Sequence, residues 1–174
     1  PSVNLEKIAR GTYGFSGASL ENLINEAALL AARHDEKVIS VDHFEIARDK
    51  IMVGAERRTL FFSDEEKRMT AYHEAGHSLL NVLLPKTDPF HKVTILARGS
   101  ALGISWSMPL NDKVSQTKTQ LESRIMVCYG GLIAEKLIFQ DQTSGVSSDL
   151  EKASSIARAM VRHFGMSSVG PVVY

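Results

Sequence analysis

Residues 73–77 read His73-Glu74-Ala75-Gly76-His77, a spacing suited to binding a metal and using it in a reaction. On a helix, His73 and His77 project from the same face, so both imidazoles can reach one Zn²⁺. Glu74 lies one step round the helix, where it can stay outside the ligand set and take a proton from a zinc-activated water. The alternative is a pair of surface histidines on an amphipathic helix. We favour the zinc site, and with it the chemistry of a zinc-dependent peptidase.

Two histidines need a third protein ligand, because a catalytic zinc site has three protein ligands and one open position. Glu135 lies within a predicted helix, and Asp149 opens the next helix after a loop that contains Gly145. An acid in the first turn of a helix is also favoured by the helix dipole alone. His91 and His163 are weaker candidates because each is isolated. Spacing by itself leaves Asp149 and Glu135 both open.

The elements that must position these residues are mostly helical. We expect the motif helix to run from residue 63 to about Pro85, a second helix to hold Glu135, and a third to hold Asp149. Their starts are indicated by three capping boxes: Ser63 with Glu66, Thr117 with Gln120, and Ser148 with Glu151. Gly130-Gly131 within the second helix lowers its helix propensity, which indicates that another segment packs closely there.

Residues 91–108 alternate between apolar and polar side chains, which predicts two strands of a small hairpin or ribbon around Arg98-Gly99-Ser100. The alternating apolar residues are Val93, Ile95, Ile104 and Trp106. The predicted fold class is therefore mainly α with a small β ribbon.

The first third of the chain predicts a small all-α unit. Residues 20–31 carry apolar side chains at helical spacing: Leu20, Leu23, Ile24, Ala27, Leu30 and Ala31. A further helix is expected after Ser40, a suitable N-cap, and should stop at Gly54. Residues 54–58 form a polar break. We therefore divide the chain into a helical unit at 1–54, a linker at 55–62 and a second domain at 63–174.

Composition excludes several classes of function. Twenty basic and twenty acidic residues cancel, so no overall field attracts nucleic acid. A single cysteine, Cys128, excludes an internal disulfide framework. No apolar run is long enough to span a membrane, and no signal peptide is visible. The chain opens at Pro1 without a methionine, which suggests a piece of a longer protein, itself expected to be soluble.

Beyond these patterns, the chain resembles the FtsH-like ATP-dependent membrane proteases almost continuously. The matching segments are Gly14-Phe15-Ser16-Gly17-Ala18, Asn25-Glu26-Ala27-Ala28, Gly54-Ala55-Glu56-Arg57-Arg58, Ala71-Tyr72-His73-Glu74-Ala75-Gly76-His77, Arg98-Gly99, Ala101-Leu102-Gly103, Tyr129-Gly130-Gly131, and Ser144-Gly145 leading to Ser148-Asp149. So many matches in the same order make chance an implausible explanation.

The resemblance implies a helical lid of an AAA ATPase followed by the N-terminal part of a mostly helical, zincin-type peptidase domain. It implies that Asp149 completes the zinc site with His73 and His77, and that Glu74 is the catalytic base. Glu135 would then hydrogen-bond a ligand imidazole. The resemblance also places Gly17 and Ala18 of the lid against a bound adenine nucleotide.

The resemblance further implies a hexameric parent protein that uses ATP and Mg²⁺ and degrades unfolded or membrane proteins. Its strand at 98–108 would be the edge to which an extended substrate adds. The parent would be anchored in the bacterial inner membrane, the mitochondrial inner membrane or the plastid thylakoid membrane through a segment outside this chain. No G-x-x-x-x-G-K-[ST] motif occurs here, so the ATPase core also lies outside this chain.

Two other functions are compatible with parts of the sequence. The chain could be an inactive lid-plus-scaffold module, which the intact His73, Glu74 and His77 disfavour. It could also be a freestanding zinc peptidase of another type, which the lid-like first third disfavours.

Overall fold

The computed structural model describes residues 3–57, 62–99, 102–108 and 115–173. Contacts divide the chain into two units, which we treat separately. The first comprises the described parts of residues 1–60 and 96–102, and the second those of residues 61–95, 103–109 and 113–174. Helices predominate, and the described strands form one two-stranded sheet, as the predicted fold class requires.

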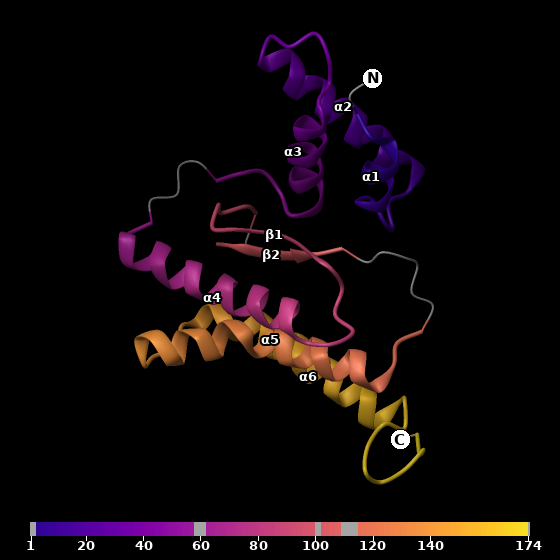
Figure 1. The fold of residues 1–174 in the computed structure, drawn as a ribbon, viewed down its shortest axis with the longest axis vertical. Helices are drawn as coiled ribbons and strands as arrows, with labels where there is room; N and C mark the ends of the chain where they lie inside the picture. The colour runs from indigo at the N-terminus through magenta and orange to yellow at the C-terminus, as the bar shows by residue number, and fades with distance from the viewer. Residues whose placement is uncertain (1–2, 58–61, 100–101, 109–114, 174) are drawn as a thin grey trace. The chain divides into compact units, whose positions relative to one another are not determined.

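The first unit is built from helices, drawn from indigo to purple in Figure 1. They are α1 (Leu5–Arg10), α2 (Gly17–Arg33) and α3 (Val41–Met52). The side chains of Asn4, Ser16 and Ser40 accept hydrogen bonds from first-turn N–H groups, which have no partner within the helix. The predicted cap at Ser40 is therefore confirmed.

The interior of the first unit lies between α2 and α3. Leu23, Ala27 and Ala47 are fully buried. Partly buried apolar residues pack around them: Ile8, Leu30, Ile39, Phe44 and Ile51. Of the face predicted for α2, Leu20 and Ile24 are instead 40% and 53% exposed. The buried stripe is narrower than the apolar pattern, because only one side of α2 packs against α3.

Within the first unit, the polar stretch that follows α3 pairs with a segment distant in the sequence. Glu56 and Arg98 form an isolated antiparallel bridge. The Arg57 N–H donates to the Ala97 carbonyl at 2.9 Å. Residues 55–57 thus have defined backbone partners. The domain boundaries at 54 and 62 stay a prediction, and residues 58–61 of the expected linker lie outside the described residues.

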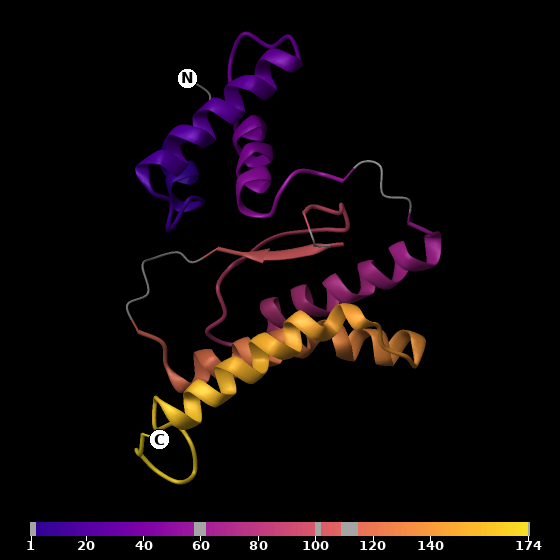
Figure 2. The ribbon, with the colours of Figure 1, turned by 180° about the vertical axis from the view of Figure 1, so that it is seen from behind.

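The second unit stacks a small sheet and a set of helices in layers (Figures 1 and 2). Helix α4 (Asp64–Leu83) packs against strands β1 (Phe90–Thr94) and β2 (Ile104–Ser107) on one side and α5 (Lys118–Phe139) on the other. Helix α5 packs in turn against α6 (Ser147–Arg162), which follows the 3₁₀ turn η1 (Ser144–Val146). The motif helix α4 is therefore the middle layer.

The two strands of the sheet run antiparallel, with Val93 opposite Ser105. The prediction of a small ribbon is confirmed, although Ile95 lies beyond the end of β1. The connection over 95–103 is longer than a tight hairpin turn. Of the expected turn, Ser100 lies outside the described residues.

Helices α4 and α5 begin at their predicted capping boxes. Ser63 and Glu66 exchange side-chain and backbone hydrogen bonds, as do Thr117 and Gln120. Helix α4 ends two residues before Pro85, because the residue preceding a proline is driven out of the helical region.

The predicted capping box of Ser148 with Glu151 is wrong. Helix α6 already begins at Ser147, and its N-cap position, Val146, provides no side-chain hydrogen bond. The chain enters through η1, where the hydroxyl of Thr143 accepts the Gly145 N–H at 3.2 Å. Because this turn continues directly into α6, the helix begins at Ser147, before the predicted cap at Ser148.

Helices α4 and α5 approach each other through glycine backbones. A Cβ added to Gly130 would lie 2.6 Å from the carbonyl oxygen of Gly76, and one added to Gly131 would lie 2.5 Å from Nε2 of His73. Both distances are well inside van der Waals contact. The predicted close packing at Gly130-Gly131 is therefore confirmed, and the segment packed there is the motif helix itself.

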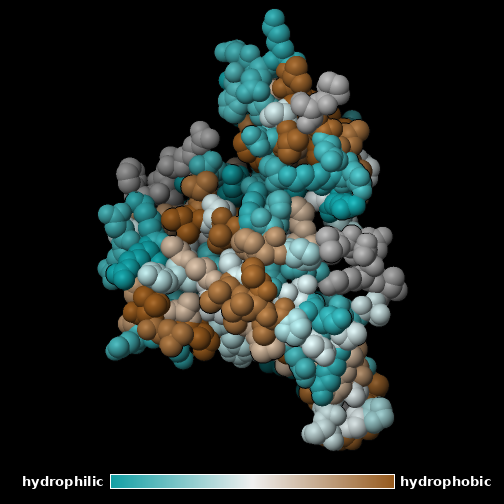
Figure 3. Space-filling model, viewed as in Figure 1, coloured by the Kyte–Doolittle hydropathy of each residue, from teal (hydrophilic) through white to brown (hydrophobic). Residues whose placement is uncertain are grey.

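Apolar side chains also remain on the surface, shown in brown in Figure 3. On α4, Leu79, Val82 and Leu83 are 59%, 64% and 68% exposed, so the motif helix is covered on only part of its circumference. In the described part of the chain, no helix combines the length and apolar character needed to cross a membrane.

Gly130→Ala should destabilise the second unit by about 1–3 kcal/mol, the usual cost of forcing a methyl group into a filled contact. The added Cβ meets a backbone carbonyl, which cannot rotate away as a side chain can. Urea unfolding followed by circular dichroism measures the loss. Gly17→Ala is the matched control, because a Cβ there has nothing within 4 Å. Equal stability of the two variants would contradict the tight contact.

Candidate metal centre

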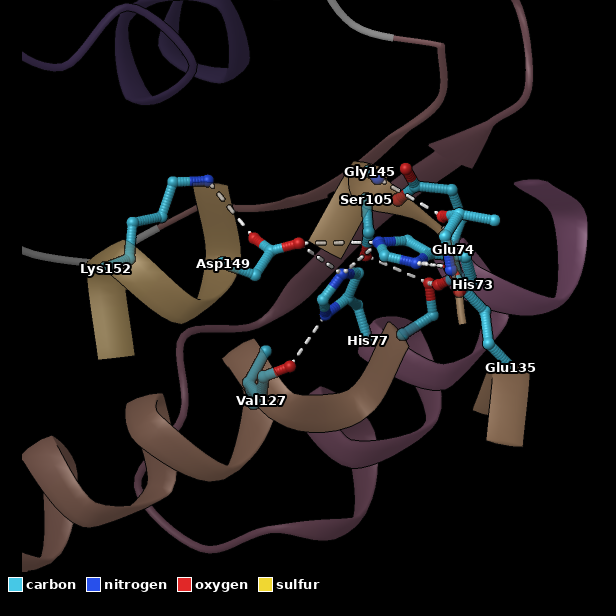
Figure 4. Close-up of polar contacts among 11 residues, drawn as sticks. His73, Glu74, His77, Ser105, Val127, Glu135, Gly145, Asp149 and Lys152 are labelled. Atoms are coloured by element: carbon cyan, nitrogen blue, oxygen red, sulfur yellow. Dashed lines mark hydrogen bonds and ion pairs between the residues drawn. The ribbon is translucent and has the colours of Figure 1, made fainter. Parts of the chain in front are cut away.

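His73 and His77 lie on consecutive turns of α4, and their imidazoles converge on one point (Figure 4). Their Nε2 atoms are 3.0 Å apart, and both side chains are largely buried. The i, i+4 spacing brings the two rings together, as the motif predicts.

The opposite nitrogen of each ring contacts an acceptor on α5. Nδ1 of His73 lies 2.7 Å from Oε1 of Glu135, and Nδ1 of His77 lies 2.7 Å from the Val127 carbonyl oxygen. A carbonyl or carboxylate oxygen accepts, so each Nδ1 carries the proton. Each Nε2 in the neutral ring is therefore left with a lone pair directed at the convergence point, the form of histidine that binds a metal.

Asp149 reaches the same point from the first turn of α6. Its Oδ2 lies 3.4 Å from Nε2 of His73 and 3.3 Å from Nε2 of His77. Glu135 does not reach the convergence point, because its two oxygens accept hydrogen bonds from Nδ1 of His73 and from Thr143, on the far side of the His73 ring. Of the two carboxylates that spacing leaves open, Asp149 lies among the Nε2 atoms, and the predicted contact of Glu135 with an imidazole is confirmed.

Glu135 also connects the loop before α6 to this site. Its Oε2 accepts the Thr143 N–H at 2.6 Å, and its Oε1 accepts the Thr143 hydroxyl at 3.2 Å. Its side chain is only 2% exposed, so both oxygens need such donors. The same carboxylate thus orients His73 and fixes the loop that leads to Asp149. The backbone donor at Thr143 has no sequence signature, and sequence analysis did not identify it.

The donor set of His73, His77 and Asp149 fits a metal ion. Two imidazole nitrogens and one carboxylate oxygen lie within 4.8 Å of one another, and none carries a proton in the neutral-histidine form. Two nitrogen lone pairs and one carboxylate charge directed at the same point favour a positive charge between them. Burial alone would lower the pKa of His73, but hydrogen bonds with Asp149 and Glu135 outweigh burial and raise it. Nitrogen and carboxylate donors in this number are those of a catalytic zinc site.

The carboxylate of Asp149 is stabilised in its charged form. Burial would raise its pKa, but the interaction of its carboxylate with the imidazoles of His73 and His77 lowers it well below the usual range. Its second oxygen, Oδ1, lies 3.3 Å from the Nζ atom of Lys152, one turn further along α6. Asp149 therefore presents one oxygen to the imidazoles and the other to a lysine that is 62% exposed.

Glu74 is buried beside the convergence point, with only 8% of its surface exposed. Burial raises the pKa of its carboxyl group above the ordinary value, although nearby His77 and His73 act in the opposite direction. A carboxylate with a raised pKa is a stronger base. The geometry thus separates Glu74 from the converging atoms while keeping it next to them on the same helix.

The weaker candidates do not join this group. His91 lies on β1 and His163 is the C-cap of α6, and neither is among the residues whose donor atoms converge. Gly17 and Ala18 form the exposed first turn of α2, directly after the Ser16 cap. Their predicted contact with a nucleotide stays a prediction.

A second group of possible ligand atoms, on His34, Glu36 and His43, occurs in the first unit. Here the hydrogen bonds argue against a metal. Nδ1 of His43 accepts the Ser40 backbone N–H at 3.1 Å, so the proton of the neutral ring is on Nε2. That Nε2 faces Nδ1 of His34 at 3.4 Å and has no lone pair left for an ion. The group is explained by the cap of α3.

Comparison with known proteins is consistent with this geometry. Residues 60–174 match the model of peptidase family M41, and residues 2–46 match the AAA+ lid domain. The ATP-dependent zinc metalloproteases FtsH 1 of Bdellovibrio bacteriovorus and FtsH 4 of Sorangium cellulosum are each 53% identical to the whole of this chain. FtsH of Myxococcus xanthus is 51% identical over the same extent. The chain covers 27% of each relative, about a quarter of their length.

Asp149→Asn and Glu135→Gln should weaken zinc binding to different degrees. Loss of a partner that orients a ligand typically lowers metal affinity about 10–100-fold, which we expect for Glu135→Gln. Asp149→Asn should cost more, because it removes a converging anionic oxygen. Competition with a chromophoric chelator measures both affinities, and Glu151→Gln, an exposed acid of α6, is the control. A larger loss for Glu135→Gln would contradict the ranking.

Proposed function

The chain belongs to peptidase family M41, and on that premise we propose that it is the lid and the first part of the peptidase domain of an ATP-dependent zinc endopeptidase. The observation that carries the proposal is the convergence of His73 Nε2, His77 Nε2 and Asp149 Oδ2 beside a buried glutamate. In this proposal, these three residues hold zinc and Glu74 is the catalytic base.

Zinc bound there would polarise the scissile carbonyl and lower the pKa of a water molecule. The proposed role of Glu74 is supported by its position next to His73 and by the raised pKa of its carboxyl group. It accepts the proton of the attacking water and delivers it to the amine that leaves when the peptide bond breaks. A base held in place by burial and helix geometry requires little rearrangement during the reaction.

The substrate is proposed to be an extended, unfolded segment of protein. Strand β2 supports this role, because it is paired with β1 on one side and is tethered to α4 close to Glu74 by the hydroxyls of Ser105 and Ser78, 3.0 Å apart. An extended chain can bind by adding backbone hydrogen bonds to such a strand. Strand addition selects for unfolded substrates, because a folded protein has few free backbone groups to offer.

The first unit supports the ATP-dependent part of the proposal. Its match to an AAA+ lid domain covers α1, α2 and the beginning of α3. We propose that Gly17 and Ala18 approach the adenine nucleotide bound by the ATPase core of the full-length protein. That protein is proposed to assemble as a hexamer, to be anchored in a membrane through another segment, and to deliver unfolded chains to the zinc site.

Glu74→Gln should abolish peptide hydrolysis while zinc remains bound. The amide keeps the shape of the side chain but cannot accept the proton, and general-base catalysis typically contributes about 10²–10⁴-fold in rate. Casein cleavage by the full-length protein and its zinc content measure the two effects. Glu65→Gln, an exposed acid on the same helix, is the matched control. Loss of stoichiometric zinc from Glu74→Gln would mean that Glu74 is a ligand.

Replacing Gly17 and Ala18 with leucine in the full-length protein should weaken nucleotide binding and stop degradation of folded substrates. Cleavage of short peptides should decline less, because these need no unfolding. Nucleotide affinity and the two cleavage rates separate the effects. Leu29→Phe, a bulky exposed position elsewhere on α2, is the control. Equal loss of both activities from an intact hexamer would contradict the proposed division of labour.

A further inference from the structure

We infer that Gly103 is a positioning residue for the base: its missing side chain leaves the space that the Glu74 carboxylate occupies. The inference rests on the proposed function, because it gives Gly103 a role only if Glu74 takes part in hydrolysis. Gly103 directly precedes β2 and lies in the same unit as α4.

Space, and not backbone conformation, is what requires glycine at this position. A Cβ on Gly103 would lie 2.7 Å from Cγ of Glu74, 2.8 Å from its Oε1, and 2.8 Å from Cγ2 of Thr70. Carbon atoms in favourable contact are about 3.5–4.0 Å apart. The φ angle of Gly103 is outside the positive range that disfavours other residues. Even alanine would therefore collide with the carboxylate side chain.

The strand cannot easily move away to relieve this collision. Two residues beyond Gly103, the Ser105 hydroxyl donates to the Ser78 hydroxyl at 3.0 Å, and Ser78 donates to the Glu74 carbonyl at 2.8 Å. Strand β2 is also held by its pairing with β1. Among the contacts of the described residues, the side chain of Glu74 has no such tether, and its rotatable bonds make it the group that yields. Restoring ordinary contact would displace it by about 1 Å.

The metal ligands are supported from elsewhere. His73 and His77 are oriented by Glu135 and Val127 on α5, and Asp149 is carried by α6. None of these residues is among the nearest atoms to a Cβ on Gly103. The ligands and the base are therefore positioned by different parts of the unit: α5 and α6 for the ligands, and the segment before β2 for the base.

Gly103→Ala in the full-length protein is the test. We expect kcat for peptide cleavage to fall about 10- to 100-fold, the effect of misplacing a reacting group by about 1 Å. Zinc stoichiometry and KM should stay within about twofold, because ligands and strand keep their places. Val82→Ile adds a methyl group of the same size to an exposed position on α4 and should leave all three unchanged. A crystal structure of Gly103→Ala should show the Glu74 carboxylate displaced.

Two outcomes would overturn the inference. An unchanged kcat would show that the carboxylate tolerates the methyl group. A raised KM with unchanged kcat would show that the strand moves and the base does not. If Gly103→Ala loses zinc or fails to fold, Thr70→Ser combined with Gly103→Ala decides, because it removes the Cγ2 contact. A double variant that folds and binds zinc but has a lowered kcat supports the inference. A double variant with wild-type kcat, or one that still fails to fold, overturns it.

Failure of the proposed function is recognised separately. Peptide cleavage by the Glu74→Gln variant would contradict the role of Glu74 itself. So would a wild-type protein that binds zinc but cleaves no peptide. If Glu74→Gln abolishes peptide cleavage and Gly103→Ala leaves kcat unchanged, only the role of Gly103 is contradicted.

Discussion

The close approach of α4 and α5 is the constraint on which the rest of the second unit depends. Gly130 meets the backbone of Gly76, and Gly131 meets the ring of His73, so no larger residue fits at either α5 position. This separation brings Glu135 and Val127 of α5 within 2.7 Å of the two Nδ1 atoms. A wider spacing would leave both imidazoles free to rotate and to adopt either tautomer. Helix packing therefore decides which nitrogens face the metal position.

The three carboxylates of this site differ in the hydrogen-bond and ion-pair partners that compensate their burial. Glu135 has two oxygens and gives them to His73 and Thr143, so its burial is matched by donors. Asp149 divides its oxygens between the two imidazoles and Lys152. Glu74 lacks a comparable arrangement of donors in the described contacts, and burial raises the pKa of its carboxyl group. The carboxyl groups of Glu74 and Asp149 thus differ in basicity because their surroundings differ.

The two sides of α4 serve different purposes. On the α5 side, the ligand imidazoles donate hydrogen bonds to Glu135 and to the Val127 carbonyl, and α6 adds Asp149 through a loop fixed to Glu135. The sheet side faces Glu74 and carries the strand proposed to receive substrate. Placing base and substrate strand on one side allows an extended chain to reach the base without disturbing the ligands. The first turn of α6, which carries Asp149, therefore matters as much as the motif.

The sequence by itself determined the motif helix, the caps at Ser63 and Thr117, and the presence of a close contact at Gly130-Gly131, because these depend on residues near one another along the chain. Periodicity could not choose between Asp149 and Glu135; the family resemblance pointed to Asp149. Only the tertiary structure brought Asp149 Oδ2 to within 3.4 Å of both Nε2 atoms and used Glu135 behind His73. The tertiary structure also shows that α6 begins at Ser147, before the predicted cap at Ser148, because η1 continues directly into the helix. Contacts across 62 to 76 residues of sequence follow from how helices pack, which local patterns do not encode.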